Sequence, residues 1–216
     1  MMDAQRGGAF ARRARGAFSL AAVAVLAVWL GLPLASASAA RSLSGTFVIA
    51  QGVASTRTPD VTLDPRVRGA TLMRFKNAGG AYSAWEPYTA SRAWTLSPGD
   101  GLKTVEAQFK GVSGSRAVLL DDITLDTTGP ATTSDYDGTP RRVVDVTLSS
   151  IDALSGVAET WYRVDGGLWR EGVFATLRIR HKRSGLAAGP HALEFYSIDG
   201  LGNVGPTGSS VITLQY

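Results

Sequence analysis

The fold is decided by a stretch in the second half of the chain, Ala158-Glu-Thr-Trp-Tyr-Arg-Val164, and by the residues Asp165-Gly-Gly167 that follow it. Successive side chains of a strand point to opposite faces, so Trp161 and Tyr162 are expected to face opposite ways. Aspartate and glycine favour tight turns, because aspartate bonds its own backbone and glycine tolerates positive φ. The stretch therefore predicts a strand that ends in a hairpin turn.

Runs of this kind recur along most of the chain. Turn clusters separate them at short intervals, and no window of ten or more residues shows a clean helical stripe of apolar residues. Many short strands at such spacing indicate an all-β sandwich or barrel. We predict strands over Thr46–Ala50, Asp60–Asp64, Thr71–Lys76, Ala93–Leu96, Lys103–Lys110, Ala117–Leu125, Val143–Ser149, Ala158–Val164, Thr176–His181, His191–Ile198 and Ser210–Leu214.

The two halves of this region resemble each other. Asp60-Val-Thr-Leu63 matches Asp145-Val-Thr-Leu148. Each unit has the size of one immunoglobulin-like sandwich, roughly 100 residues or slightly less. We predict two tandem Ig-like antiparallel β-sandwiches, at residues 41–128 and 130–216, joined by an extended, fairly stiff connection near Pro130.

The motifs of both units resemble a known class of module. They are Met73-Arg-Phe75, Trp85-Glu-Pro-Tyr88, Tyr162-Arg-Val-Asp-Gly-Gly167 and the Asp-x-x-Gly-Asn turn of Asp199–Asn203. They are similar to bacterial immunoglobulin-like and fibronectin-type-III-like repeats of secreted or cell-wall proteins. The resemblance implies a spacer, adhesion or carbohydrate-associated role without catalysis. The first unit departs from it, because its corresponding turn, Gly111-Val-Ser-Gly-Ser115, lacks both Asp and Asn.

Composition narrows the chemistry further. The chain has 25 glycines among 216 residues, no cysteine and two histidines. Disulfides, thiolate nucleophiles, and cysteine-ligated zinc or iron–sulfur centres are therefore excluded. No Gly-x-x-x-x-Gly-Lys-Ser/Thr phosphate loop occurs either.

Residues 1–40 predict a signal peptide. Four arginines precede the uncharged apolar run Ala17–Leu34, and the small residues Ala35–Ala40 offer A-x-A cleavage sites. An uncleaved signal anchor is the alternative, and would be the chain's only link to a membrane. Because four arginines and one aspartate lie in this segment, its removal lowers the net charge from +4 to about +1. No basic arm for nucleic acid then remains, and the expected location is secreted or cell surface.

Catalysis finds little support in the sequence. Asp121 and Asp122 are neighbours on one predicted strand, so they face opposite ways and cannot form a glycosidase pair. His191 and Glu194 have the same odd spacing problem. No nucleophile elbow is present. We expect a protein that is not an enzyme and needs no cofactor.

Calcium is the metal alternative, because oxygen ligands suffice for it. Asp152, Asp199 and Asn203 lie in predicted loops, and Asp135 and Asp137 lie near the junction of the two units. The competing interpretation is ordinary turn chemistry, in which these side chains bond their own backbone. Three or more oxygen ligands converging near Pro130 would favour calcium.

Aromatic side chains provide the candidate ligand site, since they stack on sugar rings as well as filling cores. Trp94 is expected to fill the first core. Trp85 and Trp169 each follow a predicted hairpin turn, and Trp85, Tyr88 and Trp169 are the glycan candidates. Exposed coplanar rings would favour this alternative.

The sequence thus predicts a non-catalytic exported module for adhesion, spacing or surface display. The alternative is a carbohydrate-binding accessory module. The expected partner is a cell-wall or extracellular polysaccharide or a surface protein.

Overall fold

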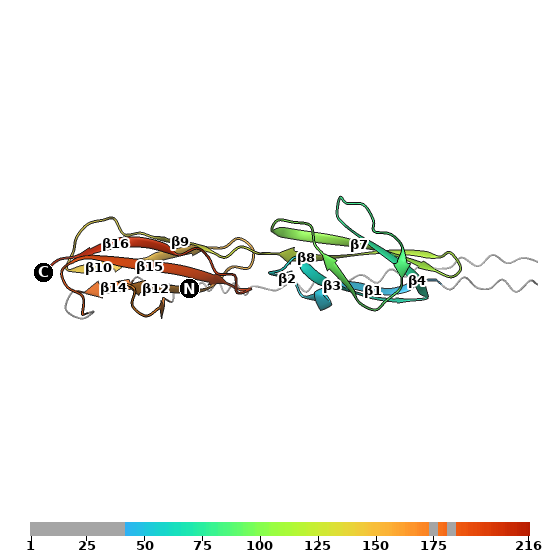
Figure 1. The fold of residues 1–216 in the computed structure, drawn as a ribbon, viewed down its shortest axis with the longest axis horizontal. Coiled ribbons are helices and arrows are strands. Elements are labelled where there is room, and N and C mark those ends of the chain that lie inside the picture. Colours follow the sequence, from blue (N-terminus) through green and yellow to red (C-terminus); the bar gives the residue numbers. More distant parts are fainter. Residues whose placement is uncertain (1–41, 173–176, 181–184) are drawn as a thin grey trace, which may run out of the picture. The chain divides into compact units, whose positions relative to one another are not determined.

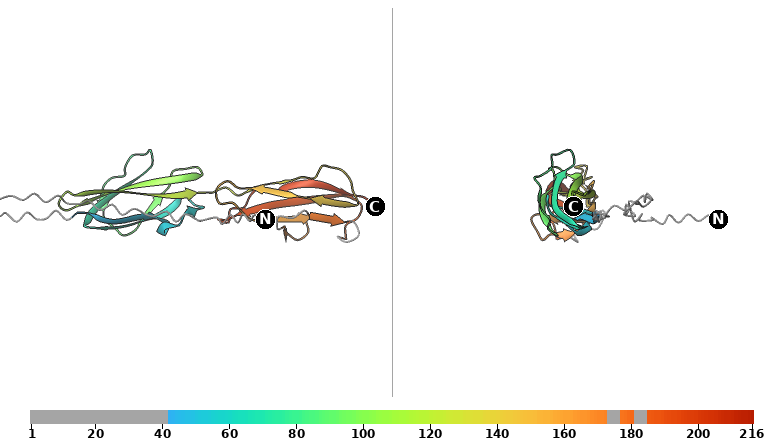
Figure 2. Two further views of the ribbon diagram at one scale, coloured as in Figure 1. Left: turned by 180° about the vertical axis from the view of Figure 1, so that it is seen from behind. Right: turned by 90° about the vertical axis from the view of Figure 1, so that its right-hand side faces the viewer.

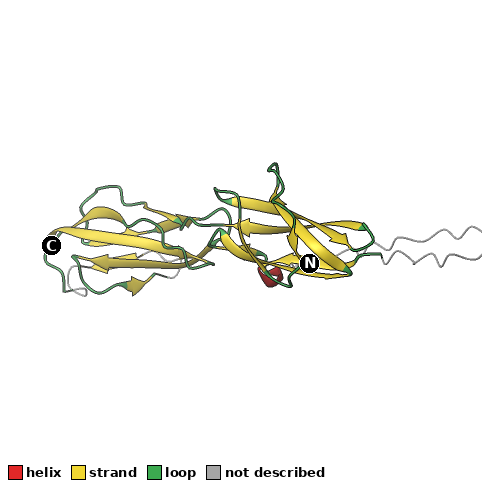
Figure 3. Cartoon of the chain, turned by 45° about the vertical axis from the view of Figure 1, so that its right-hand side comes forward, coloured by secondary structure: helices red, strands yellow, loops and turns green. Residues whose placement is uncertain are grey.

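The chain forms strands almost throughout the region that the structure describes. The computed structural model describes residues 42–172, 177–180 and 185–216. Strands dominate it, and the helical segment η1 spans only Ala50–Gly52 (Figure 3). The predicted signal peptide lies outside the described residues. The all-β prediction is confirmed.

Strands β1 to β8 make the first sandwich. Its three-stranded sheet has the order β1-β3-β6, and its five-stranded sheet has the order β2-β8-β7-β4-β5. Figures 1 and 2 show β1 and β3, in blue, as a layer opposite β7, in green. The bounds are β1 Ser44–Ile49, β2 Ser55–Thr56, β3 Asp60–Arg68, β4 Ala70–Asn77, β5 Glu86–Pro87, β6 Arg92–Thr95, β7 Gly101–Gly111 and β8 Arg116–Leu125.

Strands β9 to β16 make the second sandwich. The pairs β9–β11 and β10–β14 form one side, and the sheet β13-β12-β15-β16 forms the other. The bounds are β9 Ala131–Ser134, β10 Val143–Val146, β11 Leu148–Ile151, β12 Val157–Val164, β13 Arg170–Glu171, β14 Leu177–Arg180, β15 Gly189–Asp199 and β16 Gly208–Leu214.

Both sandwiches have the strand order of an immunoglobulin-like fold. In the first sandwich, β1, β3 and β6 take the places of Ig strands A, B and E and face a sheet of the remaining strands. In the second, β9, the broken strand β10–β11, and β14 take these places. The first edge strand also crosses between sheets. Ser55–Thr56 runs parallel to the end of β8, and Arg141 makes the corresponding parallel bridge to Leu214. The prediction of two Ig-like sandwiches is confirmed by this pairing.

Each sandwich has its own core, which follows from the alternation of its strands. Buried residues of the first are Phe47, Ile49, Leu63, Val67, Met73, Phe75, Leu96, Val105, Ala107, Phe109, Ile123 and Leu125. Those of the second are Val144, Val146, Leu177, Ile179, Leu193, Phe195, Ile212 and Leu214. Tyr162 packs on the second core while Trp161 pairs with Tyr196 along the sheet, so the predicted opposition of Trp161 and Tyr162 holds.

Every predicted strand corresponds to an observed one, with a few differences. The predicted strand over Val143–Ser149 is divided at Thr147 into β10 and β11. The ends of the predicted Thr176–His181 strand lie outside the described residues, and its centre is β14. The sequence missed β9 and the two-residue edge strands β2, β5 and β13.

Candidate functional site

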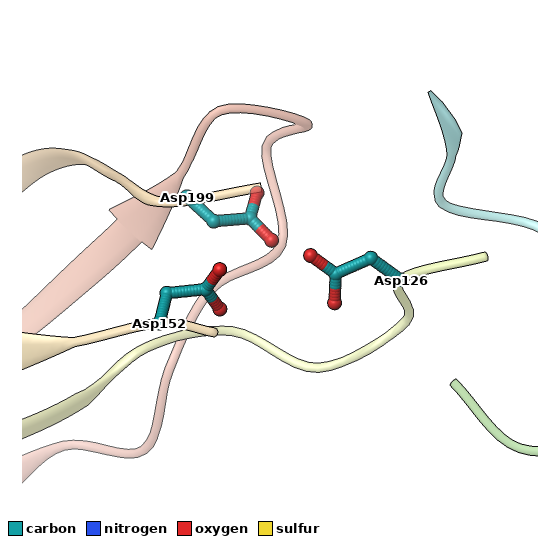
Figure 4. A group of neighbouring side chains, drawn as sticks. All are labelled: Asp126, Asp152 and Asp199. Atoms are coloured by element: carbon teal, nitrogen blue, oxygen red, sulfur yellow. The ribbon is translucent and has the colours of Figure 1, made fainter. Parts of the chain in front are cut away.

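Three aspartates converge where the first sandwich leads into the second. Asp126 directly follows β8, Asp152 directly follows β11, and Asp199 ends β15. One carboxylate oxygen of each lies within 4.8 Å of the others. Figure 4 shows the three carboxylates pointing toward one another. Asp126 is 1% exposed and Asp199 is 2% exposed, so two of these carboxyl groups are buried.

Backbone donors hold all three carboxylates. Asp152 Oδ1 accepts the N–H groups of residues 154, 155 and 156. Asp199 Oδ1 accepts those of residues 201 and 203, while its Oδ2 accepts the Asn203 side-chain amide at 2.6 Å. Asp126 accepts the N–H groups of Thr128 and Ser155. Buried carboxylates with such partners do not pay the full cost of lost hydration.

The electrostatics of Asp199 reflect this environment. Burial disfavours its charged form and by itself raises the pKa. Hydrogen bonds from the backbone and side chain of Asn203 and from the Leu201 backbone outweigh burial, so the pKa of Asp199 lies below its ordinary value. Asp199 is therefore a charged, structural residue at neutral pH.

The segment between the sandwiches is held by the second one. The Asn203 amide donates to the Asp126 carbonyl at 2.8 Å. The backbone at Gly205 also lies directly against the backbone at Pro130. A Cβ added to Gly205 would lie 1.9 Å from the Pro130 carbonyl oxygen. Gly129 is equally crowded by Val204 and Gly205. Only glycine fits at these two positions.

The calcium and turn interpretations both concern this cluster. The convergence that we set as the condition for calcium is met by Asp126, Asp152 and Asp199, whose oxygens are of the kind calcium prefers. The hydrogen bonds are those expected for turn chemistry, and they explain each aspartate without an ion. Asp135 and Asp137 are not part of the cluster. Asp135 accepts the Thr147 N–H, and Asp137 accepts the Thr139 N–H and pairs with Arg141.

Asp126 is the member that sequence reasoning missed. It belongs to the connection Leu125–Pro130, which was interpreted only as a stiff linker. The nearby sequence signal was its resemblance in type to Asp152 and Asp199, each an aspartate followed within four residues by glycine. Its proximity to the other two is a tertiary contact, so no local pattern predicts it.

Aromatic side chains gather on the outer face of the five-stranded sheet in the first sandwich. The guanidinium of Arg74 lies 4.4 Å from the Tyr82 ring centroid and 4.5 Å from that of Trp85. Lys76 lies 4.7 Å from the Tyr82 centroid and pairs with Glu106 at 2.9 Å. Trp85 is half-buried, as are Tyr82 and Arg74. These contacts have the geometry of cation–π interactions.

Tyr88 has a structural place instead. Its ring packs edge-on against Phe109, with centroids 6.3 Å apart. Its hydroxyl donates to the Pro65 carbonyl and accepts the Val67 N–H, both at 3.0 Å. Both ends of the side chain are thus used within the sandwich, and the outer aromatic face is built without it.

The second sandwich carries a related aromatic group, formed by Trp161, Trp169 and Tyr196. The Trp169 and Tyr196 rings are 4.7 Å apart at 77°, so they are not coplanar. Arg163 lies 4.5 Å from the Trp169 centroid and pairs with Glu194 at 2.7 Å. All three rings are half-buried.

The residues considered for catalysis have structural partners. Asp121 accepts the Ile49 N–H on one face of β8, and Asp122 accepts the Thr104 hydroxyl on the other. His191 and Glu194 likewise face opposite ways. His191 Nδ1 lies 2.6 Å from Asp165 Oδ2.

Comparisons with known proteins give distant structural matches. The chain is similar to the fibronectin(III)-like modules of Clostridium thermocellum CbhA, with 13% identity, a TM-score of 0.39, and coverage of 79% of this chain and 94% of that one. It is also similar to a tetra-tandem repeat from the extending region of a large adhesion protein, with 18% identity and a TM-score of 0.32 over 80% of this chain and 50% of that one. A mixed-linkage glucan utilization protein of Bacteroides ovatus, SGBP-B, gives 14% identity and a TM-score of 0.23 over 74% and 43%. These likenesses are too distant to assign a function.

No family model and no curated protein matches the chain. Within the described ranges, no helix has the length and apolar character needed to cross a membrane. The chain is an all-β protein of two Ig-like sandwiches, as its strand pairing shows.

Proposed function

We propose that this chain is a non-catalytic exported module for adhesion, spacing or surface display. The observation that supports the proposal is the use of the junction carboxylates. Asp126, Asp152 and Asp199 all accept backbone N–H groups, so they organise loops and hold residues 126–130. Acidic groups committed in this way serve a scaffold.

The test uses protein expressed from the full chain. It is incubated with isolated bacterial cell walls and with a panel of soluble polysaccharides, and both retention and new reducing ends are measured. We expect retention on at least one surface without release of products. Product formation that survives further purification would show an enzyme and overturn the proposal.

Carbohydrate binding is the second candidate. The Trp169 and Tyr196 rings are not coplanar, and what supports the candidate is the gathering of aromatic residues on the outer sheet faces. Trp161, Trp169 and Tyr196 lie together on the second sandwich, and Trp85 with Tyr82 occupies the corresponding place on the first. Half-exposed indoles are the usual stacking surface for sugar rings. We therefore propose Trp85 and Trp169 as sugar-contacting residues.

Substitution separates these roles. Trp169→Ala and Trp85→Ala should each weaken retention on a bound polysaccharide while the melting temperature changes little. Trp94→Ala is the matched control, because Trp94 packs on the first core. If Trp169→Ala and Trp85→Ala bind as well as the unchanged protein, the aromatic faces are not the binding surface.

The domain bounds remain a proposal, with one adjustment for the junction. We propose that each sandwich folds alone. A fragment of the second should begin at Asp126, because Ser155 and Asn203 bond that residue. Cooperative unfolding of fragments 41–125 and 126–216 is the expected result, and a disordered fragment would contradict it.

Export is likewise a proposal and rests on the sequence of residues 1–40. N-terminal sequencing of the secreted protein should begin between Ser38 and Ser42. An intact Met1 on membrane-bound protein would instead support the uncleaved anchor.

A further inference from the structure

The two sandwiches place an arginine at the same point of the same sheet. In the first, Arg74 of β4 stands opposite Gln108 of β7. In the second, Arg163 of β12 stands opposite Glu194 of β15. In both, a tryptophan from the segment after the arginine's strand covers the guanidinium, Trp85 at 4.5 Å and Trp169 at 4.5 Å. The two sites are therefore structural equivalents.

The partner across the sheet makes the two arginines electrically different. Arg163 donates through Nε and Nη2 to the two oxygens of Glu194, at 2.7 and 3.0 Å. This hydrogen-bonded ion pair raises the pKa of Arg163 and lowers that of Glu194. Arg74 donates through the same two nitrogens to one neutral amide oxygen of Gln108, at 2.9 and 2.7 Å. Gln108 fixes the direction of the guanidinium without cancelling its charge.

No other described carboxylate compensates Arg74. Glu106, which stands opposite Lys76, pairs with Lys76 at 2.9 Å and accepts the Tyr82 hydroxyl, and Glu86 on β5 pairs with Arg92 at 2.8 Å. Nη1 of Arg74 makes no hydrogen bond within the described part of the chain. The first site thus holds one net positive charge over the ring of a half-buried indole, and the second site holds none from its arginine.

We propose that the outer face of the first sandwich binds a carboxylate-bearing polysaccharide, with a sugar carboxylate on Arg74 and a sugar ring on Trp85. The proposal rests on the carbohydrate-binding candidate above and names its substrate class. Charge complementarity carries it, because an oriented arginine with a neutral partner can form a charge-assisted pair with a carboxylate. The neutralised site of the second sandwich suits uncharged sugars.

The decisive experiment exchanges the two partners. Protein from the full chain is tested on polygalacturonate and on fully methyl-esterified polygalacturonate, which has the same backbone with its carboxylates blocked. The unchanged protein should bind the acid form at least about tenfold more tightly than the ester, and added NaCl should weaken that binding. Gln108→Glu should abolish the preference, because it neutralises Arg74 as Glu194 neutralises Arg163. Glu194→Gln should increase binding of the acid form.

Controls keep the result interpretable. Gln108→Glu creates a pair already present in the second sandwich, so its melting temperature should not fall, and Arg163→Gln should leave acid binding unchanged. Equal binding of acid and ester, or an undiminished preference in Gln108→Glu, would overturn the inference while leaving carbohydrate binding intact. Equal retention on inorganic polyphosphate would show simple ion exchange and also overturn it. Binding to no polysaccharide at all, acidic or neutral, would remove the carbohydrate candidate itself.

Discussion

The two sandwiches share one strand order but fill it differently. The first core is aromatic: Phe75 contacts Phe47, Trp94 and Phe109 with ring centroids 5.9, 5.9 and 6.4 Å apart. The second core is mostly aliphatic and includes one buried phenylalanine, Phe195. The cross-strand register pairs Phe75 with Ala107 and Val164 with Leu193, so a large-small pair is replaced by two medium side chains.

The two sandwiches also differ in the polar groups of their interiors. The interior of the second sandwich includes a cluster of hydroxyls around Ser197, which bonds Thr132, Ser150 and Thr160 at 2.7 to 2.8 Å. Both sandwiches close the equivalent turn by a backbone bond, from the Gly111 N–H to the Ser115 carbonyl in the first and from the Asp199 N–H to the Asn203 carbonyl in the second. The second turn also uses the Asp199 carboxylate, which accepts the N–H groups of Leu201 and Asn203. The same fold thus accepts either aromatic rings or hydrogen-bonded polar groups in its interior, provided that side chains along each strand still alternate between core and solvent.

The largest expected effect comes from the aromatic core. Phe75→Ala should reduce the free energy of unfolding by about 3–5 kcal/mol, because it empties a fully buried ring site. Val164→Ala at the equivalent place should cost distinctly less, because it removes fewer atoms from a half-buried site. Denaturant unfolding measures both, and equal costs would show that the two cores are not packed as described.

The next largest effect is a difference in unfolding free energy between substitutions of the two tryptophans of the first sandwich. Trp94 packs on Phe75 and donates to Asn77 at 2.9 Å, but it is only half-buried. Trp94→Ala should therefore cost about 2–3 kcal/mol, less than a fully buried ring. Trp85→Ala should cost under about 1 kcal/mol. A large loss for Trp85→Ala would make it a core residue and remove it from the proposed sugar surface.

The third largest loss of stability is expected from the Asp199 turn of the second sandwich. Asp199→Ala removes the acceptor of Leu201, Asn203 and the Asn203 amide, and should cost about 2 kcal/mol. Asp122→Ala is the control, since among the described residues its exposed carboxylate accepts a hydrogen bond from the Thr104 hydroxyl alone. Unfolding of the two variants in denaturant should give clearly different midpoints, and coincident midpoints would refute the structural role of Asp199.

Near neutral pH, we expect His191 of the second sandwich to make stability depend on pH. The Asp165 hydrogen bond, joined by one to the Ala187 carbonyl, raises the pKa of His191 despite burial. The protonated ring donates to both acceptors, so its contribution is complete below the ordinary histidine pKa near 6.5 and is lost as pH rises through the raised folded pKa. We expect the melting temperature to decline over that interval. Val105 is the residue equivalent to His191 in the first sandwich, because Gln108 and Glu194 occupy equivalent positions. His191→Val should therefore make the melting temperature nearly independent of pH in this range. An unchanged slope would show that other groups cause the pH dependence.

The smallest effect is expected from metal removal. Because N–H donors already satisfy Asp126, Asp152 and Asp199, EDTA should leave the melting temperature of the protein unchanged. Thermal unfolding in EDTA and in millimolar Ca²⁺ makes the comparison. A clear rise with Ca²⁺ that disappears in Asp152→Asn would instead establish the calcium alternative.

Local patterns predict the strands well and the site only in part. Alternation placed Trp161 and Tyr162 on their correct faces, because side-chain direction in a strand is a local property. The strand β9 was missed, because Ala131-Thr-Thr-Ser134 has few apolar residues and is defined by its pairing with β11. Tyr88 was a glycan candidate, yet its hydroxyl reaches β3, more than twenty residues earlier in the chain. Contacts of that kind follow from tertiary structure alone.

The parallel edge pairings have a mechanical consequence. The Ala54 and Thr56 carbonyls bond the N–H groups of Thr124 and Asp126, and Arg141 exchanges such bonds with Thr213 and Gln215. Tension applied between the first strand of a sandwich and its last therefore pulls along these strands and loads their hydrogen bonds together, in shear. Antiparallel hairpins pulled from their open ends would yield one bond at a time. Each sandwich thus has, at its edge, a parallel strand pairing oriented to resist stretching.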